Sequence, residues 1–477
     1  MSVFRTISAT GLFGLAFAAL AADQPPAAVA QALAGARVPP SAAAIAVFEA
    51  NGGRPVLRAN DAAPMNPAST MKLLTTFAAL ELLGPAFRWR TEAYVDGALR
   101  EGVLAGNLVL RGGGDPRLDL ESFWMLLRAL RARGLREIRG DLVLDRSYFA
   151  RANGGSGAFD GEPYRPYNVA PDALLVNYNA LRFLFLPGRE GDPRPVRIAV
   201  EPHPPTLEVI NNLRLASGPC VEGRAFREML APTFEPSRPR AIFAGRYPAS
   251  CGERELNVAL LAPNDHVGGL MRQLWREAGG AWSGAVREGP APANAAPFYV
   301  HESPPLGLVV RDVNKLSNNV MARHLFLTLG AHAAGPPGDP DKAAAAVRNW
   351  LARKGIAAPE LALENGSGLS RIERLSAATL AALLQAAWRS SVMPEFVASL
   401  PIVAVDGTMR RRLAGEPIAG QAHIKTGLLA DVRAIAGYLL DRAGRRMVVV
   451  MIVNHANAAQ TQAAMDELLR WVYERGD

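Results

Sequence analysis

The stretch Asn66-Pro67-Ala68-Ser69-Thr70-Met71-Lys72 opens a helical run that extends from Met71 to Leu83 and ends at Gly84-Pro85. Ser69 and Lys72 are three residues apart, and residues at that spacing share one face of a helix. A serine hydroxyl is a poor nucleophile until a base removes its proton, and lysine can be that base where burial lowers its pKa. The apolar residues after Lys72 supply such burial. We therefore predict that Ser69 is a nucleophile and Lys72 its general base.

A second motif, Ser317-Asn318-Asn319, occurs once in the chain. It places a hydroxyl and an amide two residues apart. Ser317 can therefore pass a proton to a leaving amine, while Asn319 can hydrogen-bond a peptide backbone. A polar loop or helix edge is the alternative reading of such a triplet.

A third motif, Lys425-Thr426-Gly427, stands directly before a predicted strand. Gly427 has no side chain, so a substrate can approach the strand edge closely, and an extended peptide can add there as a further strand. Lys425 would supply a positive field, and Thr426 could bind a carboxylate. The backbone N–H groups of Ser69 and Leu428 are candidate oxyanion donors.

The few lysines of this chain favour a chemical role for two of them. Only five of the 52 basic residues are lysine, and two of these five lie in the motifs above. A position that keeps lysine in an arginine-rich chain needs something that arginine cannot supply, and release of a proton is the obvious candidate. The five are Lys72, Lys315, Lys342, Lys354 and Lys425.

The three motifs, in this order, resemble the signature of penicillin-binding proteins and serine β-lactamases. The long gap from Ser69 to Ser317 is similar to that of class C low-molecular-mass penicillin-binding proteins, of the penicillin-binding protein 4 type, in which further domains are inserted after the first motif. Four supporting segments resemble the same family: Gly112-Gly113-Gly114-Asp115-Pro116, Gly140-Asp141-Leu142-Val143-Leu144-Asp145, Asn365-Gly366-Ser367-Gly368-Leu369-Ser370-Arg371 and Val405-Asp406-Gly407-Thr408.

This resemblance implies a serine D-alanyl-D-alanine carboxypeptidase and DD-endopeptidase. It would cleave peptidoglycan stem peptides and cross-links through an acyl-serine at Ser69, and β-lactams would acylate it covalently. The resemblance also implies that Lys72 is the base, that Ser317 relays protons, and that Asn319 and Thr426 hold the substrate.

For the side chain of the substrate, the resemblance implicates Asp115 and Arg371, which match positions that contact the amino-acid end of a diaminopimelate residue. Both have plainer readings, Asp115 as a turn residue before proline and Arg371 as a surface cation. The apolar Leu428-Leu429-Ala430 departs from the family, which often has a polar group at the Ala430 position.

Two other functions compete with this one. A β-lactamase shares the acylation step, but we find no convincing Glu-x-x-Leu-Asn segment for a deacylating base, and the chain is far longer. A non-catalytic peptidoglycan-binding protein is the alternative from another class, and the intact Ser69, Lys72 and Ser317 argue against it. No Gly-x-Ser-x-Gly occurs, which argues against an α/β-hydrolase.

The predicted fold is α/β (α+β): an antiparallel sheet flanked by helices, built from both ends of the chain, with β-rich domains inserted between them. Helices are expected over 306–329, 341–353 and 376–388, followed by strands over 434–440 and 447–453 and a last helix over 459–474. The expected parts are a signal peptide (1–22), a catalytic domain (23–90 and 300–477), an inserted domain (91–165 and 257–299) and a nested β-rich domain (166–256).

The N-terminal sequence, the two cysteines and the charge indicate the compartment and the kinds of partner to expect. Arg5 precedes an apolar run that ends at Ala19-Leu20-Ala21, which is typical of a cleaved secretory signal and predicts a periplasmic protein with no stable membrane anchor. An uncleaved membrane anchor is the alternative reading of this run. An oxidising compartment favours a disulfide between Cys220 and Cys251, with two buried thiols as the alternative. The net charge is +8, but the basic residues are scattered, so we expect no nucleic-acid partner. No histidine spacing suggests a metal, and no cofactor is expected.

Overall fold

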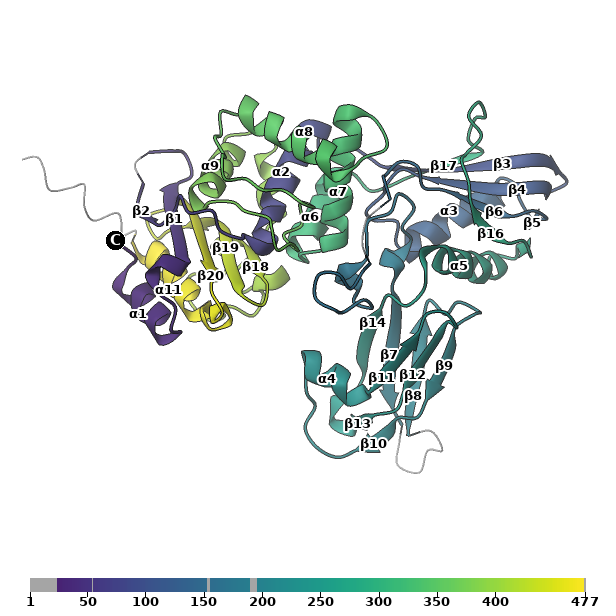
Figure 1. Cartoon of the computed structure of the whole chain (residues 1–477), viewed down its shortest axis with the longest axis horizontal. Helices are drawn as coiled ribbons and strands as arrows, with labels where there is room; N and C mark the ends of the chain where they lie inside the picture. The colour runs from purple at the N-terminus through teal and green to yellow at the C-terminus, as the bar shows by residue number, and fades with distance from the viewer. Residues whose placement is uncertain (1–23, 54, 152–154, 189–194, 476–477) are drawn as a thin grey trace, which may run out of the picture.

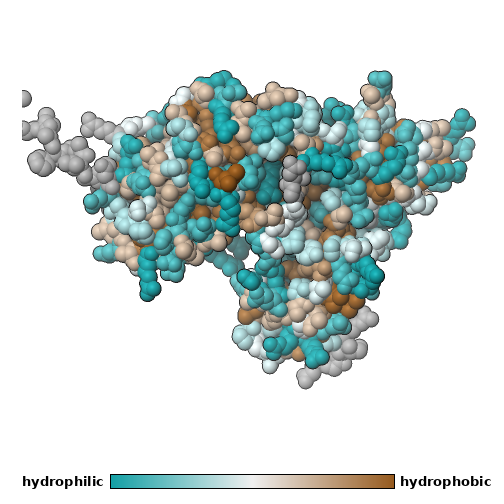
Figure 2. Space-filling model, viewed as in Figure 1, coloured by the Kyte–Doolittle hydropathy of each residue, from teal (hydrophilic) through white to brown (hydrophobic). Residues whose placement is uncertain are grey.

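The computed structural model describes residues 24–475 except 54, 152–154 and 189–194. The predicted signal peptide over 1–22 therefore lies outside the described residues. In Figure 1 a helix-flanked sheet stands at the left, a second sheet at the right and a β-rich lobe below them. Hydrophilic residues dominate the face seen in Figure 2, and apolar residues form small groups on it. Among the described helices, none is long and apolar enough to cross a membrane.

The first sheet is antiparallel throughout and combines both ends of the chain, as predicted. Its side chains alternate between two cores. Ala46 and Val450 face one core, and their neighbours Val47 and Val449 face the other. This period of two with both faces buried explains the continuous apolar run of the last strand. The strand order is β18 (Ala422–Leu428), β19 (Val432–Leu440), β20 (Arg446–Asn454), β1 (Ala43–Glu49) and β2 (Leu57–Ala59).

Helices cover both faces of this sheet. On one face lie α1 (Ala27–Gly35) and α11 (Gln462–Glu474), which pack against each other. The other face is covered by the larger group of helices. These are α2 (Met71–Leu83), α6 (Leu306–Lys315), α7 (Asn319–Ala334), α8 (Pro340–Arg353), α9 (Ala377–Trp388) and α10 (Met393–Ala398).

The single helix expected over 306–329 is wrong, because the chain breaks between α6 and α7. Ser317 has a left-handed backbone, with φ of 56°, which ends α6. Asn318 then caps α7 by accepting a hydrogen bond from the backbone N–H of Met321 at 3.1 Å. The break places the second motif at a helix start, where its side chains can face a cavity.

The chain between the two halves forms a second sheet with α3 (Leu120–Ala132) and α5 (Pro263–Glu277) packed on it. The strands β3 (Arg90–Arg100) and β4 (Val103–Gly112) are its long central hairpin. The shorter strands are β5 (Glu137–Ile138), β6 (Leu142–Asp145), β15 (Ala281–Trp282), β16 (Val286–Glu288) and β17 (Tyr299–Glu302).

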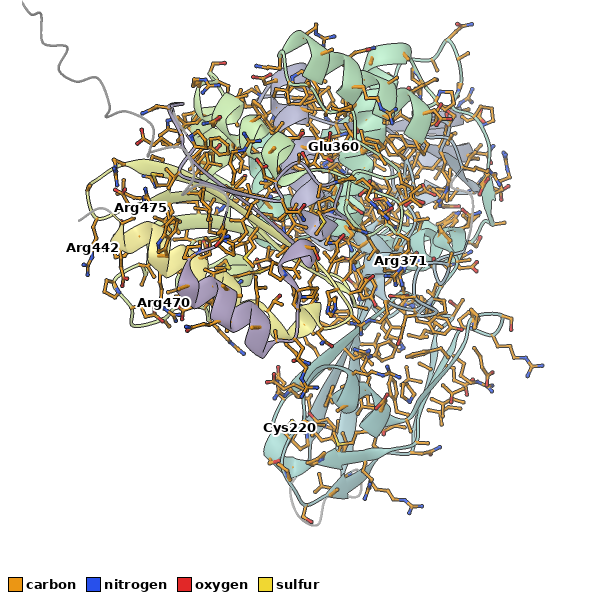
Figure 3. All side chains as sticks on the ribbon, turned by 60° about the vertical axis from the view of Figure 1, so that its left-hand side comes forward. Cys220, Glu360, Arg371, Arg442, Arg470 and Arg475 are labelled. Carbon is orange, nitrogen blue, oxygen red and sulfur yellow. A yellow bond between two sulfur atoms is a disulfide. The ribbon has the colours of Figure 1, made fainter. Side chains whose placement is uncertain are left out.

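The lobe has its own aromatic-rich core and contains the disulfide Cys220–Cys251, with Cys220 labelled in Figure 3. Its strands are β7 (Leu181–Pro187), β8 (Val196–Glu201), β9 (Glu208–Asn211), β10 (Arg214–Ala216), β11 (Pro232–Glu235), β12 (Arg240–Phe243), β13 (Arg246–Pro248) and β14 (Arg254–Val258), with helix α4 (Gly223–Leu230). The predicted domain limits stay a prediction. The strand β17 pairs with β3, so the second sheet continues beyond residue 299, where the inserted domain was expected to end.

Candidate active site

The first motif lies where a short 3₁₀ turn, Ala68–Thr70, leads into α2. Lys72 is fully buried in the first turn of α2. Its Nζ lies 2.9 Å from Ser69 Oγ, 2.6 Å from Asn319 Oδ1 and 2.5 Å from the backbone oxygen of Ser367. The structure thus joins the first and second motifs through one amine.

The surroundings of Lys72 favour its neutral form. Burial lowers the pKa of Lys72 well below its usual value, and the positive charge of Lys425 lowers it further, whereas Glu373 opposes this. A neutral amine has two hydrogens and one lone pair. The carbonyl oxygens of Asn319 and Ser367 can only accept, so they take the two hydrogens and leave the lone pair for the hydroxyl of Ser69.

A buried carboxylate holds the loop that supplies the Ser367 oxygen. Glu373 Oε1 accepts backbone hydrogen bonds from Glu364, Asn365 and Gly366 at 2.8–3.2 Å, and its Oε2 accepts one from Gly368 at 2.9 Å. The motif over Asn365–Arg371 predicted this loop but not Glu373, because nothing local marks a buried glutamate in a polar stretch.

Gly368 is required by the close approach of the same loop to the nucleophile. A Cβ at this position would lie 1.8 Å from the backbone oxygen of Ala68, and φ is +79°. Only glycine combines that conformation with that contact.

The third motif meets the second in the same way. Lys425 is fully buried, and its Nζ donates to Ser317 Oγ and to the backbone oxygen of Thr426, both at 2.8 Å. Burial lowers the pKa of Lys425 to about 7. Two lysines of depressed pKa thus each contact one motif serine, Lys72 contacting Ser69 and Lys425 contacting Ser317.

The edge strand β18 carries the rest of the third motif. Gly427 has a role that the sequence did not reveal: a Cβ there would lie 2.8 Å from the backbone oxygen of Pro67, so glycine also lets the 3₁₀ turn pack onto the strand. Thr426 Oγ1 is hydrogen-bonded to Thr408 Oγ1 at 2.8 Å. Leu428 is exposed.

A cavity of about 780 Å³ contains most of the predicted site residues. Lys72 and Lys425 lie buried beneath it. The predicted residues that line it are Ser69, Ser317, Asn319, Arg371, Thr426, Gly427 and Leu428, and Ala430 lines it as well.

The lining of this cavity includes a cation, Arg371, and an anion, Asp160, and each has a contact that orients it. The guanidinium of Arg371 stacks on Phe159 at 4.5 Å from the ring centroid, and it pairs with Asp431 at 3.3 Å. Arg371, labelled in Figure 3, thus contacts the inserted chain through Phe159. Asp160, which no sequence motif predicted, lines the same cavity and accepts from the Tyr167 hydroxyl at 2.8 Å. Burial raises the pKa of Asp160, but its hydrogen bonds outweigh burial and lower it.

Asp115 does not line the cavity. It is 2% exposed, and its Oδ1 accepts from the backbone N–H of Arg117 at 2.8 Å, which is the geometry of a turn residue. Burial raises its pKa to about 7. A role for Asp115 in contacting the substrate side chain stays a prediction; in the structure its Oδ1 closes a turn with Arg117.

No group of three or more metal-ligating side chains lies within the part of the chain that the structure describes.

Comparison with known proteins shows the family to which the chain belongs. The chain matches the D-Ala-D-Ala carboxypeptidase 3 (S13) family over residues 26–474. It is 26% identical over 394 residues to the D-alanyl-D-alanine carboxypeptidase DacB of Haemophilus influenzae, covering 82% of this chain and 80% of that protein. It is 29% identical over 424 residues to a D-alanyl-D-alanine carboxypeptidase of an Actinomadura species, covering 84% and 76%.

Among solved structures, penicillin-binding protein 4 of H. influenzae has the same fold, with a TM-score of 0.75 at 24% identity over 92% of this chain and 99% of that one. The predicted fold class and the resemblance to penicillin-binding protein 4 are thereby confirmed. The chain belongs to the D-Ala-D-Ala carboxypeptidase 3 (S13) family and is a peptidase of the serine D-Ala-D-Ala carboxypeptidase type.

Proposed function

We propose that this carboxypeptidase is also a DD-endopeptidase, that it works through an acyl-enzyme on Ser69, and that penicillin acylates the same hydroxyl. The observation that carries the proposal is the hydrogen bond between Lys72 Nζ and Ser69 Oγ in a fully buried setting. The name of penicillin-binding protein 4, whose fold this chain shares, supports the β-lactam part.

In the acylation step, the lone pair of Lys72 takes the proton of Ser69, and Ser69 Oγ forms a bond to the carbonyl carbon of the penultimate D-alanine. The backbone N–H groups of Ser69 and Leu428 would stabilise the oxyanion. The C–N bond then breaks as Ser317 gives its hydroxyl proton to the leaving nitrogen. Ser317 regains a proton from Lys425, with which it shares a hydrogen bond of 2.8 Å.

The two lysines therefore exchange charge during the cycle. Lys425 begins as an ammonium and Lys72 as an amine, and after acylation the charges are reversed. Because the charge of Lys425 adds to burial in lowering the pKa of Lys72, losing that charge makes the newly formed Lys72 ammonium easier to hold. Hydrolysis restores the start: water loses a proton to Lys425 through Ser317, and Lys72 returns its proton to Ser69.

For the substrate, we propose that Thr426 binds its carboxylate and that Arg371 and Asp160 bind the charged end of a diaminopimelate side chain. A carboxylate and an ammonium need one cation and one anion, and Arg371 and Asp160 line the same cavity. Asn319 has its oxygen turned to Lys72, so its amide nitrogen remains for the peptide. The site of action would be the periplasm, as the predicted signal at 1–22 indicates and as the disulfide favours.

The test is the intact mass of the protein after incubation with benzylpenicillin, for the wild type and for Ser69→Ala. A one-to-one adduct on the wild type that is absent from Ser69→Ala is the expected result. An unmodified wild type would leave the alternative of a peptidoglycan-binding protein without acyl-transfer chemistry. Turnover of nitrocefin in large molar excess, instead of near-stoichiometric consumption, would favour the β-lactamase alternative.

A further inference from the structure

A second cavity, of about 550 Å³, opens next to the catalytic one. The two cavities share Tyr167, Ser317 and Asn319, but Ser69 and Thr426 line only the first. From Ser317 the second cavity extends toward the lobe. The two cavities therefore meet at the hydroxyl that, in the proposed function, protonates the leaving nitrogen.

Because Ser317 lines both cavities, its position determines which part of a substrate each cavity can bind. The acyl half lies at Ser69, in the cavity that contains Arg371. The leaving nitrogen lies at Ser317, so whatever is attached to that nitrogen continues into the second cavity. Free D-alanine is too small to need it, whereas the leaving half of a cross-link is a whole peptide.

The lobe side of the second cavity presents a row of polar side chains. Arg182 on β7 is paired across the sheet with Asn257 on β14 and with Glu201 on β8. All three line the cavity. Cross-strand partners project from the same face of a sheet, so a cation stands between an amide and a carboxylate. The only salt bridge of Arg182 within the described residues, to Glu255, is 3.9 Å long and exposed, so its guanidinium can take a better partner.

A strained turn forms another part of the cavity's lining. Asn177, Tyr178 and Asn179 have consecutive left-handed φ values of 49°, 53° and 52°. Hydrogen bonds fix the turn: the backbone N–H of Asn177 donates to Leu118 O, and Asn179 Nδ2 donates to Leu261 O, both at 2.8 Å. Conformations of this kind persist where the surroundings enforce them, and they gather at ligand-holding sites. This turn presents Asn177 and Tyr178 to the cavity.

We infer that the second cavity binds the leaving peptide of a cross-link, an acidic peptide joined through the side-chain amine of diaminopimelate. The inference rests on the proposed function and deepens it, because it assigns a structural basis to endopeptidase activity apart from carboxypeptidase activity. Arg182 binds a carboxylate of the leaving peptide, and the amides of Asn177 and Asn257 bind its backbone. The bond that breaks is the amide between D-alanine and that amine, and the amine leaves with the proton from Ser317.

The experiment compares two substrates on the full-length protein. One is a pentapeptide ending in D-Ala-D-Ala, and the other is a dimer of tetrapeptides cross-linked from D-alanine to diaminopimelate. We expect Arg182→Ala to lower kcat/KM for the dimer roughly tenfold or more, as befits a lost charge-assisted hydrogen bond, and to leave the pentapeptide within about twofold. Arg197→Ala is the matched control, because this exposed arginine lies on the neighbouring strand β8 but does not line the cavity.

A variant that fills the cavity tests the same idea without changing charge. Ala180 lines the cavity, so Ala180→Trp should also slow cleavage of the dimer while benzylpenicillin acylation stays at the wild-type rate. Equal losses on both substrates, or unchanged cleavage of the dimer by both variants, would overturn the inference while the proposed acyl-enzyme stands. A wild type that cleaves the pentapeptide and not the dimer would overturn it together with the endopeptidase part of the proposed function.

Discussion

Replacing Lys72 by methionine should separate catalysis from stability in this protein. Methionine has nearly the length of lysine but no amine. In the folded protein the change removes the proposed base of Ser69 and, with it, the donor to Asn319 Oδ1 and Ser367 O. A positioned general base contributes about 10²–10⁴ in rate. At 1.36 kcal/mol per tenfold, the barrier to acylation should rise by about 2.7–5.4 kcal/mol.

The effect on stability has two parts of opposite sign. Two buried acceptors lose their donor, which costs about 1–3 kcal/mol each. Against this, an amine whose pKa is depressed by burial is removed from a site that is fully buried. The unfolded chain holds this lysine as an ammonium, so folding must release its proton, and methionine avoids that cost. The free energy of unfolding of Lys72→Met should therefore fall by less than the roughly 2–6 kcal/mol that the loss of both donors would cost alone.

The assay is the second-order rate of benzylpenicillin acylation, followed by intact mass, together with urea unfolding of the same samples. Lys342→Met is the matched control, because Lys342 also donates to two backbone oxygens, Gly335 O at 3.0 Å and Pro337 O at 2.7 Å, but lies outside the site. It should be acylated at the wild-type rate. Acylation of Lys72→Met within tenfold of the wild type would refute the assignment of Lys72 as the base.

Three further predictions follow from particular contacts. Burial lowers the pKa of Lys425 to about 7, far below its value in the unfolded chain, so the folded state releases this proton first. The free energy of unfolding of the wild type should therefore rise relative to Lys425→Met as the pH increases from about 7 to 10, and parallel pH curves in urea titrations would contradict this. Gly368→Ala should destabilise the protein by roughly 2–5 kcal/mol in the same assay, because its Cβ would lie 1.8 Å from a backbone oxygen. Gly420→Ala, with a similar φ of +78° and no neighbour within 4 Å, should cost far less. Removing the Cys220–Cys251 disulfide, which spans 31 residues, should lower the stability of the lobe by about 3–4 kcal/mol in calorimetry and leave penicillin acylation unchanged.

Local patterns made part of the fold predictable. The helix over Met71–Leu83 is confirmed because an apolar run and the Gly84-Pro85 stop define it without help from the rest of the chain. The break between α6 and α7 was not predicted, since apolar residues continue on both sides of it. What ends α6 is the left-handed backbone of Ser317, whose hydroxyl is held by Lys425, 108 residues away in the chain.

The site also combines contacts that the local sequence predicts with contacts that only the fold brings about. Ser69 and Lys72 are close in sequence, so helical spacing predicted their contact, although Ser69 lies in a 3₁₀ turn just before α2. The contacts of Lys72 with Asn319 and Ser367 span more than 200 residues, and only the fold reveals them. Asp160 was missed for a related reason: a single acid in a glycine-rich loop carries no pattern until the loop is placed beside Arg371.

Lys315 is one of the five lysines and lies outside the three motifs, but it also contributes to the site. It is nearly buried, at 8% exposed, and its Nζ donates to Leu400 O at 2.9 Å and to Asp406 at 2.5 Å. Because Asp406 is two residues before Thr408, this ion pair fixes the loop whose Thr408 hydroxyl is hydrogen-bonded to Thr426. Lys315 is itself two residues before Ser317. One ammonium at the end of α6 therefore connects the second motif to the third through the loop that carries Thr408. The planar guanidinium of arginine has a different geometry and is not an equivalent replacement for this ammonium. Three of the five lysines thus hold the site together, and only two of them carry the proposed chemistry.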